Sequence, residues 1–301
     1  MLELSKHIGT GFGKGELYDV LTELQLFCGG VNQGEVYFVE GNAGDDGYDG
    51  SSWDKAFKTL AKAIAISNAN IAAGSSGWAA RNTIFCKGDS LTEDLTTGPS
   101  KCDVIGVGSC KHIPHCRLVG EHVITTSSTM GCRWINMEFY NDDASAIFTY
   151  TGGGFEFHNC VFRANSDSVS AIVTSAPHDV KICNCEFLED SEGDAFDTVA
   201  IAITGGAYNC QIRNNFITGD LGITIGAGNY YHCLIDRNVF HTVGMCINDA
   251  AEDWLMTNNQ LMASVNTGTV TNIVTGSAYL ACNNICTGTT GGASISYPVI
   301  T

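Results

Sequence analysis

Two adjacent carboxylates, Asp142 and Asp143, could form a catalytic pair in this chain of 301 residues. Inverting hydrolysis of a glycosidic bond needs one carboxylic acid to protonate the leaving group and one carboxylate to activate water, both facing one cleft. No second run of carboxylates accompanies the pair at a matching spacing, and a solvated Asp-Asp turn accounts for it equally well. Asp142 and Asp143 are therefore catalytic candidates without a complete set, and the sequence favours a protein that is not an enzyme.

A second group of acidic residues is dense enough to hold a cation. Six carboxylates fall within twelve residues: Glu186, Glu189, Asp190, Glu192, Asp194 and Asp197. Hard cations such as Ca²⁺ take oxygen ligands of this kind, although an exposed acidic loop has the same composition. Glu189, Asp190, Glu192 and Asp194 are the candidate ligands, and calcium is the one cofactor that the sequence leaves open. Asp45, Asp46 and Asp49 allow the same two interpretations, calcium or Asp-Gly turns.

Soft ligands gather at Cys110, His112, His115 and Cys116, which are residue types that bind zinc. Adjacent residues of an extended chain point apart, so the pair at 115–116 fits a zinc site poorly. The chain has 14 cysteines, several of them inside the repeats described next, where a thiol behaves as a small buried apolar group. We therefore expect mostly reduced cysteines, with pairing among Cys102, Cys110 and Cys116 as the alternative.

A repeat of about 25 residues decides the architecture. Seven segments share the pattern apolar-x-Asn-x-x-Phe or a close variant, at 134–139, 157–162, 182–187, 212–217, 235–240, 256–261 and 281–286. Aligned on one position they give the column Met137, Cys160, Cys185, Asn215, Asn238, Asn259 and Asn284. A period in this range is typical of stacked supersecondary units. The Asn residues of the column are interpreted as structural, with amides bonded to backbone groups above and below.

A second column moves in step with the first. It contains Ile147, Ile172, Ile201, Ile223, Ile247 and Ile273, each followed by a turn of small residues. Alternation of apolar and polar residues within each unit indicates strands, and no unit has room for a helix. We predict an all-β parallel β-helix with strands at 133–139, 155–162, 181–187, 210–217, 233–240, 254–261 and 279–286. We also predict that the six Ile side chains form one buried stack.

The chain divides into an N-terminal part, residues 1–34, and a β-helix, residues 35–301. Within the second part we expect a first strand and a capping helix at 35–80, coils at 81–290 and a tail at 291–301. Ser51 and Ser52 could cap a helix with residues 53–66 as its body. Residues 1–14 form a polar, Gly-rich arm. An amphipathic helix is predicted at 16–28, whose apolar positions are proposed to bind a partner: Leu17, Val20, Leu21, Leu24 and Phe27.

Composition limits the partners. The formal net charge is −17 and the pI about 4.6, which argues against binding to nucleic acid and to anionic membranes. No apolar run approaches the roughly 18 residues that span a bilayer. The first 30 residues lack a cationic start followed by an apolar core, so we expect synthesis without export, in the cytoplasm of the producing cell.

Residues 49–64 (DGSSWDKAFKTLAKAI) resemble the segment that opens pectin-lyase-like proteins, and residues 82–88, 104–108 and 118–120 resemble their first strands. The resemblance implies a right-handed parallel β-helix closed by a short helix. It implies little about activity, because this superfamily hosts many functions. Polygalacturonase-like members carry Asn-Thr-Asp, Asp-Asp, Gly-His-Gly and Arg-Ile-Lys strings. Only Asp142-Asp143 matches one of them, and the lyase-type surroundings of a basic residue are missing as well.

Residues 78–85 (WAARNTIF) and 101–109 (KCDVIGVGS) are similar to uncharacterised proteins of tailed phages that tend to be encoded among virion genes. The resemblance implies a virion structural protein assembled in the host cytoplasm, either a capsid decoration (cement) protein or a small spike. Its partner would be the major capsid protein or another virion protein, and homotrimers are common among such β-helices. The alternative is a carbohydrate-active or glycan-binding β-helix, such as a tailspike-type depolymerase or a polysaccharide lyase. An enzyme should show convergent side chains across adjacent coils.

Overall fold

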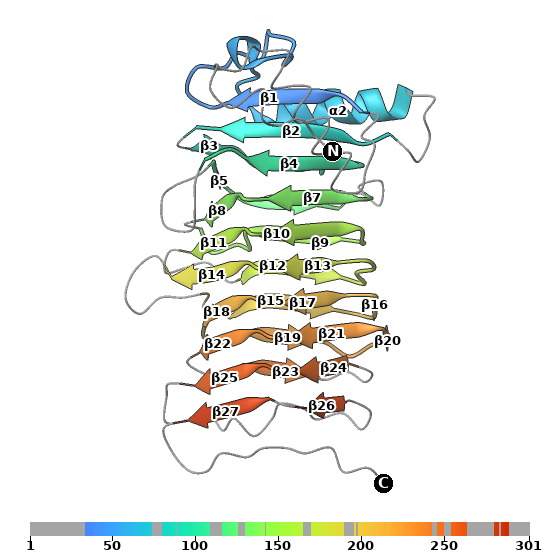
Figure 1. Cartoon of the computed structure of the whole chain (residues 1–301), viewed down its shortest axis with the longest axis vertical. Coiled ribbons are helices and arrows are strands. Elements are labelled where there is room, and N and C mark those ends of the chain that lie inside the picture. The colour runs from blue at the N-terminus through green and yellow to red at the C-terminus, as the bar shows by residue number, and fades with distance from the viewer. Residues whose placement is uncertain are drawn as a thin grey trace, which may run out of the picture.

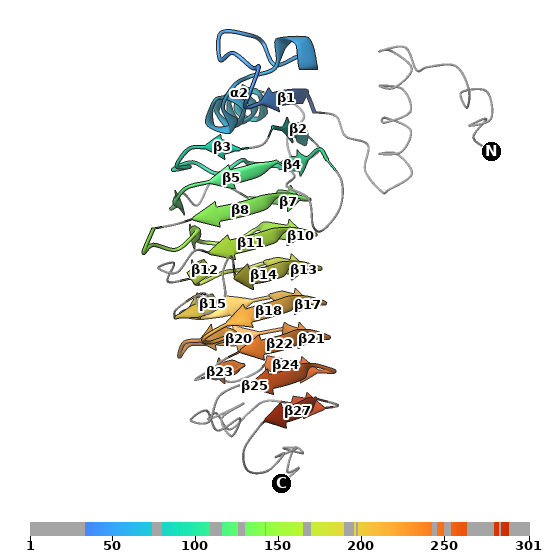
Figure 2. The same cartoon turned by 90° about the vertical axis from the view of Figure 1, so that its left-hand side faces the viewer.

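The computed structural model describes residues 34–73, 80–88, 90–108, 116–125, 130–141, 143–164, 170–189, 196, 198–242, 246–249, 254–263, 280–282 and 284–288. These residues form a parallel β-solenoid with one α-helix near its N-terminal end (Figures 1 and 2). The predicted fold class is thereby confirmed. No helix in these ranges is long and apolar enough to cross a bilayer.

Three long sheets run along the solenoid, and every strand pair in them is parallel. Sheet A contains β1 (Val36–Glu40), β2 (Asn82–Lys87), β4 (Cys102–Gly106), β7 (Cys132–Ile135), β10 (Phe155–His158), β13 (Lys181–Cys183), β17 (Gln211–Arg213), β21 (Cys233–Asp236), β24 (Trp254–Thr257) and β26 (Leu280–Cys282). Sheet B contains β3 (Leu91–Thr92), β5 (Arg117–Val119), β8 (Glu138–Asn141), β11 (Val161–Ala164), β14 (Glu186–Glu189), β18 (Phe216–Gly219), β22 (Val239–Thr242), β25 (Gln260–Ala263) and β27 (Ile285–Gly288).

Sheet C closes the coil on its third side. It contains β6 (His122–Ile124), β9 (Phe148–Thr151), β12 (Ser170–Ser175), β15 (Val199–Thr204), β19 (Ile223–Ile225) and β23 (Ile247–Asp249). A two-stranded sheet of β16 (Ala207–Tyr208) and β20 (Tyr230–Tyr231) lies at the corner between sheets C and A. A complete coil therefore has three main strands, where the repeat pattern predicted two.

Each predicted long strand is in fact two strands joined by a bend. Residues 133–139, for example, split into β7 and β8 because Asn136 between them has φ of 56°. The bend recurs with nearly the same φ at Asn159, Asn184, Asn214, Arg237 and Asn258. Asn tolerates this left-handed conformation better than other residues with a side chain, so an Asn column marks the corner between sheets A and B.

The residue after the bend points inward and forms the column that aligned the repeats. Arg117 pairs with Glu138 and Val161 with Glu186, so the column begins one coil earlier than predicted, at Cys116. Its C-terminal half is an amide ladder: Asn238 Oδ1 accepts hydrogen bonds from Asn215 N (3.0 Å) and Asn215 Nδ2 (2.9 Å). Asn238 Nδ2 donates to the carbonyl oxygen of Ile212 at 2.9 Å. The structural interpretation of these residues is confirmed.

Four of the six Ile residues predicted to stack do so in the structure. Ile172, Ile201, Ile223 and Ile247 are consecutive register partners and are buried. Ile147 was wrongly included, because Phe148 is the residue that pairs with Ile172. Ile273 lies outside the described residues.

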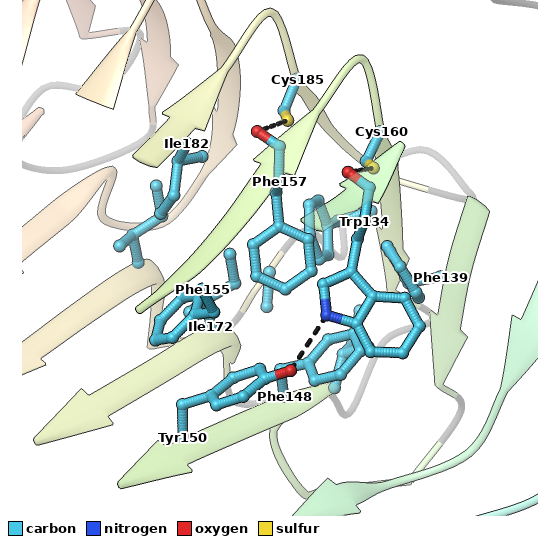
Figure 3. Packing of buried hydrophobic residues seen from close by; sticks show 14 of the residues in the cluster. Trp134, Phe139, Phe148, Tyr150, Phe155, Phe157, Cys160, Ile172, Ile182 and Cys185 are labelled. Carbon is cyan, nitrogen blue, oxygen red and sulfur yellow. Dashed lines mark hydrogen bonds between the residues drawn. The ribbon is translucent and has the colours of Figure 1, made fainter. Parts of the chain in front are cut away.

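Aromatic packing explains that one-residue offset. The ring of Phe148 lies 4.8 Å from that of Phe139, 5.2 Å from Phe157 and 5.6 Å from Trp134, all fully buried (Figure 3). Such aromatic pairs add stabilisation beyond the apolar area they bury. Trp134 Nε1 also donates to Tyr150 Oη at 2.9 Å, which satisfies both polar atoms inside the core.

The N-terminal end is closed by a helix that starts later than predicted. Residues 53–55 form only a short 3-10 helix, η2 (Trp53–Lys55), and Ser52 makes no capping bond. Phe57 instead pairs with Val39. The α-helix α2 spans Leu60–Ala73, and its first amides are capped by Glu93 Oε1 and Oε2, which accept from Leu60 N (2.7 Å) and Ala61 N (2.8 Å).

Candidate functional site

The outer face of sheet A carries a run of alternating charges. Asp103, Arg133, Glu156 and Lys181 are successive register partners on β4, β7, β10 and β13, one per coil. Strand neighbours of a parallel sheet are about 4.8 Å apart, so Arg133 and Glu156 each face opposite charges on both sides, while Asp103 and Lys181 end the run. This face is the largest gathering of chemically competent side chains in the described residues.

Asp103 is held between two guanidinium groups. Its Oδ1 accepts from Arg81 Nε at 2.8 Å and from Arg133 Nε at 2.7 Å. Arg133 Nη2 also donates to Oδ2, which makes that pair bidentate. Bidentate guanidinium–carboxylate pairs are the geometrically most specific ion pairs in proteins. Asp103 is 8% exposed, so the cations cover the carboxylate from solvent.

Glu156 occupies the same kind of setting two coils further on. Lys181 Nζ lies 2.7 Å from its Oε1, and His158 Nε2 lies 2.7 Å from its Oε2. Burial alone raises the pKa of this carboxyl, but the hydrogen bonds and charges of His158 and Lys181 outweigh burial and lower the pKa to about 2. Glu156 is consequently ionised across the physiological pH range and cannot donate a proton.

Asp236, on β21, is the third clamped carboxylate of sheet A and is 5% exposed. Burial raises its pKa, yet hydrogen bonds from Asn258 and Thr257 and the nearby guanidinium groups of Arg237 and Arg213 leave the pKa below its usual value. The Thr257 Oγ1 and Asn258 Nδ2 bonds to Oδ1 measure 2.7 Å and 2.9 Å.

Sheet B repeats the arrangement once. Glu138, 4% exposed, receives Arg117 Nη2 at 2.7 Å and Arg163 Nε at 3.2 Å on its Oε1. All six arginines of the chain are thus bound to three carboxylates, two to each: Arg81 and Arg133 to Asp103, Arg117 and Arg163 to Glu138, Arg213 and Arg237 to Asp236.

This chemistry suits cohesion better than catalysis. A general acid at neutral pH needs a carboxyl whose pKa is raised, and a general base needs an accessible lone pair. Asp103, Glu138, Glu156 and Asp236 are each bound by at least one basic side chain from an adjacent coil, and the Oδ1 of Asp236 also accepts hydrogen bonds from Thr257 and Asn258. The raised carboxyl pKa among the resolved shifts belongs to Glu93, through burial, and its oxygens cap α2.

A second polar group lies at the corner between sheets C and A. Tyr208 and Tyr231 are register partners, 54% and 45% exposed, with ring centroids 4.9 Å apart and an interplanar angle of 25°. His178 pairs with Tyr208 from the preceding coil. Asn209 Nδ2 donates to Asp179 Oδ1 at 2.7 Å beside them. We call these five residues the corner patch.

The predicted catalytic pair is not brought to either group. Asp143 is exposed in the loop between β8 and β9, where its amide donates to Asn141 Oδ1 at 3.2 Å, and Asp142 lies outside the described residues. The backbone of Glu189 ends β14, while Asp190, Glu192 and Asp194 lie outside those residues. Asp45, Asp46 and Asp49 bond to the loop and to the start of α2, as in Asp-containing turns.

Of the four soft ligands, only Cys116 is described. It is 1% exposed, lies in the core beside Cys86, and is a free thiol, as is Cys102. Cys110, His112 and His115 lie outside the described residues, as do Leu17, Val20, Leu21, Leu24 and Phe27. Within the described residues no group of three or more His, Cys, Asp or Glu side chains is placed to hold a metal ion.

The alternating charges on the outer face of sheet A, which we call the charged ladder, were not predicted, although the pattern is visible in the sequence. Asp103, Arg133, Glu156 and Lys181 fall at the same position of successive repeats and alternate in sign. Aligning the outward columns as well as the inward ones would have revealed it. The same alignment would have placed Arg213 and Thr257 beside Asp236, but not Arg237, which reaches that carboxylate from the bend.

No family model matches the chain, and no curated protein matches it. Two crystal structures of a GH136 lacto-N-biosidase from Eubacterium ramulus, a selenomethionine derivative and the native protein, align with it at TM-scores of 0.32 and 0.28. Sequence identities are 9% and 10%, and each alignment covers 90% of this chain and 70% of that chain. A similarity of this size carries no inference about activity.

Proposed function

We propose that the protein is a non-catalytic structural component of a tailed-phage virion, a capsid decoration protein or a small spike. The observation that carries the non-catalytic part is the clamping of Asp103, Glu138, Glu156 and Asp236 by cations of adjacent coils. These outward charges form ion pairs that hold neighbouring coils together. The assignment to a virion rests on the resemblance of residues 78–85 and 101–109.

Attachment is assigned to the N-terminal segment, residues 1–28. The C-terminal side of this segment leads directly into β1, at the end of the solenoid that α2 closes. The partner would be the major capsid protein or another virion protein, and the assembled form a homotrimer.

Particles that lack the protein provide the test. Purified full-length chain should bind them at a fixed, saturating number of copies, and a chain without residues 1–28 should remain folded and bind none. A matched control carries Leu234→Glu and Leu255→Glu on the outer face of sheet A and should bind like the parent. Full binding by the truncated chain would refute attachment through the N-terminal segment.

A glycan-binding solenoid is the second candidate, favoured by the corner patch. Exposed Tyr rings beside Asn, Asp and His side chains combine an apolar surface with hydrogen-bonding groups, which is the composition of many ligand sites. Tyr208→Ala/Tyr231→Ala should abolish retention on immobilised host polysaccharide if this candidate is correct. Equal retention of parent and variant, or none of either, would eliminate the corner patch as a glycan site.

A further inference from the structure

An apolar column lies beside the alternating charges on the outer face of sheet A. Phe38, Phe85, Ile105 and Ile135 are successive register partners on β1, β2, β4 and β7. We call these four residues the apolar column. Each is partly exposed, and Val107 beside them is 42% exposed. Below Ile135 the same column becomes polar, with His158 and Cys183.

Trp53 covers only the upper end of the apolar column. Its ring meets that of Phe38 edge to face at 4.8 Å, and Lys87 Nζ lies 4.5 Å from the ring centroid on the other side. The column lies on the outer face shown toward the viewer in Figure 1, along β1, β2, β4 and β7. No described segment packs over Ile105 and Ile135 there.

We propose that residues 16–28 of the same chain bind along the apolar column as an amphipathic helix. This proposal does not depend on the virion role, and it replaces partner binding by the apolar positions of residues 16–28: those side chains would face the chain's own sheet, which leaves residues 1–14 as the part of the N-terminal segment for attachment. The apolar stripe from Leu17 to Phe27 would be about 15 Å long in a helix. Four strands of a parallel sheet, from Phe38 to Ile135, span about 14 Å. The two apolar surfaces therefore match in length when the helix runs parallel to the solenoid axis.

The length of the chain between residues 16–28 and β1 limits where on sheet A these residues can bind. Residues 29–35 extend at most about 25 Å. A second pair of aliphatic residues on this face, Leu234 and Leu255, lies on β21 and β24, and β21 is seven strands from β1, about 33 Å. Phe27 cannot reach them. The N-terminal end of the solenoid is already covered by α2, whose Leu60, Ala63 and Ile64 are buried.

Charge complementarity points the same way. Residues 16–28 contain Glu16, Asp19 and Glu23 and no Lys or Arg. Three cations flank the apolar column, Arg81, Lys87 and Arg133, and they pair with the carboxylates of Glu40 and Asp103. These cations lie on a chain with a net charge of −17. An acidic helix on this face would meet cations, whereas the charge of the whole molecule would repel it.

Amide hydrogen exchange of the full-length protein tests the proposal. Residues 16–28 should exchange at least about tenfold more slowly than an unstructured segment, and equally at low and high protein concentration. Ile105→Glu/Ile135→Glu should abolish that protection without changing exchange of β10 to β24. The matched control, Leu234→Glu/Leu255→Glu, makes the same change on the same face and should leave residues 16–28 protected.

A variant in residues 16–28 controls for the possibility that substitutions in sheet A disturb the solenoid itself. Leu17→Glu/Leu24→Glu leaves the body untouched and should release residues 16–28 to the same extent. Protection that appears only at high concentration would overturn the proposal in favour of binding by the helix of a second copy. Protection unaffected by Ile105→Glu/Ile135→Glu, or absent from the parent, would overturn it outright.

Discussion

On the outer faces of sheets A and B, each of four carboxylates binds two basic side chains. Asp103, Glu138 and Asp236 each bind two arginines from different coils, and Glu156 binds Lys181 and His158. Exposed ion pairs contribute little one at a time, but these carboxylates are recessed and each binds two basic side chains. Their removal would leave cations facing each other across neighbouring strands.

The amide ladder gives a first prediction at this scale. Asn238→Ala removes an acceptor of two hydrogen bonds and a donor of two, all buried. Leaving such groups unpaired should lower the free energy of unfolding by about 2–4 kcal/mol. Chemical denaturation measures it. Asn229→Ala, at an exposed amide outside the ladder, should change stability by less than about 0.5 kcal/mol. Equal effects of the two substitutions would contradict the ladder.

His122 gives a second prediction. Its side chain is fully buried against Phe148, its Nδ1 accepts from Leu95 N at 3.2 Å, and its Nε2 has no partner. Burial lowers its pKa from 6.5 to about 4, against the opposing charge of Asp94. The unfolded chain therefore binds a proton first as the pH falls, so stability should decline between pH 6.5 and 4, by roughly 3 kcal/mol.

His122→Asn keeps an acceptor for the Leu95 amide and removes the titration. Its stability should stay nearly flat between pH 6.5 and 4.5, where the parent loses part of its own. Below pH 4.5 both proteins should weaken, because the lowered pKa of Glu156 makes its ionised form part of the folded state. A parent whose stability is constant from pH 7 to 4.5 would disprove a neutral, buried His122.

At the scale of elements, the repeat predicted the solenoid and the inward columns but not the bends. The period fixes which residues stack, since side chains of one column must fit the same neighbours above and below. It does not fix the backbone angle at Asn136 or Asn184, so each A–B corner was predicted as one straight strand. The offset at Ile147 has a different cause, because ring packing of Phe148 with distant strands sets that register.

The capping helix shows the same limit. Ser52 has the right type for an N-cap, yet the cap comes from Glu93 and the loop residue Asp46, whose carboxylate binds Lys58 N and Thr59 N at 2.9 Å. Glu93 is 33 residues from Leu60, and no local pattern announces such a contact. Of the candidate site, the alternating ladder was readable from the repeat, whereas the bend position of Arg237 was not.

A prediction at this scale concerns the Ile stack. Ile223→Asp places a charge between Ile201 and Ile247, where it has no partner, and should abolish cooperative folding or lower the melting temperature by more than 10 °C, as a loss of about 4 kcal/mol would. Thr224→Asp, the next residue with its side chain outward, should lower the melting temperature far less. Similar melting curves for the two variants would show that the register is wrong.

At the scale of the whole molecule, the described residues form a long parallel solenoid whose outward carboxylates Asp103, Glu138, Glu156 and Asp236 are bound by basic side chains. We predict no hydrolase or lyase turnover on acidic polysaccharides, measured by release of reducing ends or unsaturated products. Turnover that disappears in Asp142→Asn/Asp143→Asn would restore the catalytic interpretation of that pair. Turnover that disappears in Glu156→Gln instead would place catalysis on the ladder of sheet A.

The central claim, the proposed structural role in a virion, is tested most directly by quantitative mass spectrometry of purified particles of a phage whose genome carries the coding sequence. The account predicts that the protein is present at a constant copy number, in a whole-number ratio to the major capsid protein or to a tail protein, and that it survives repeated density-gradient purification. Its absence from such particles, with the protein recovered only from the soluble lysate of infected cells, would contradict the account.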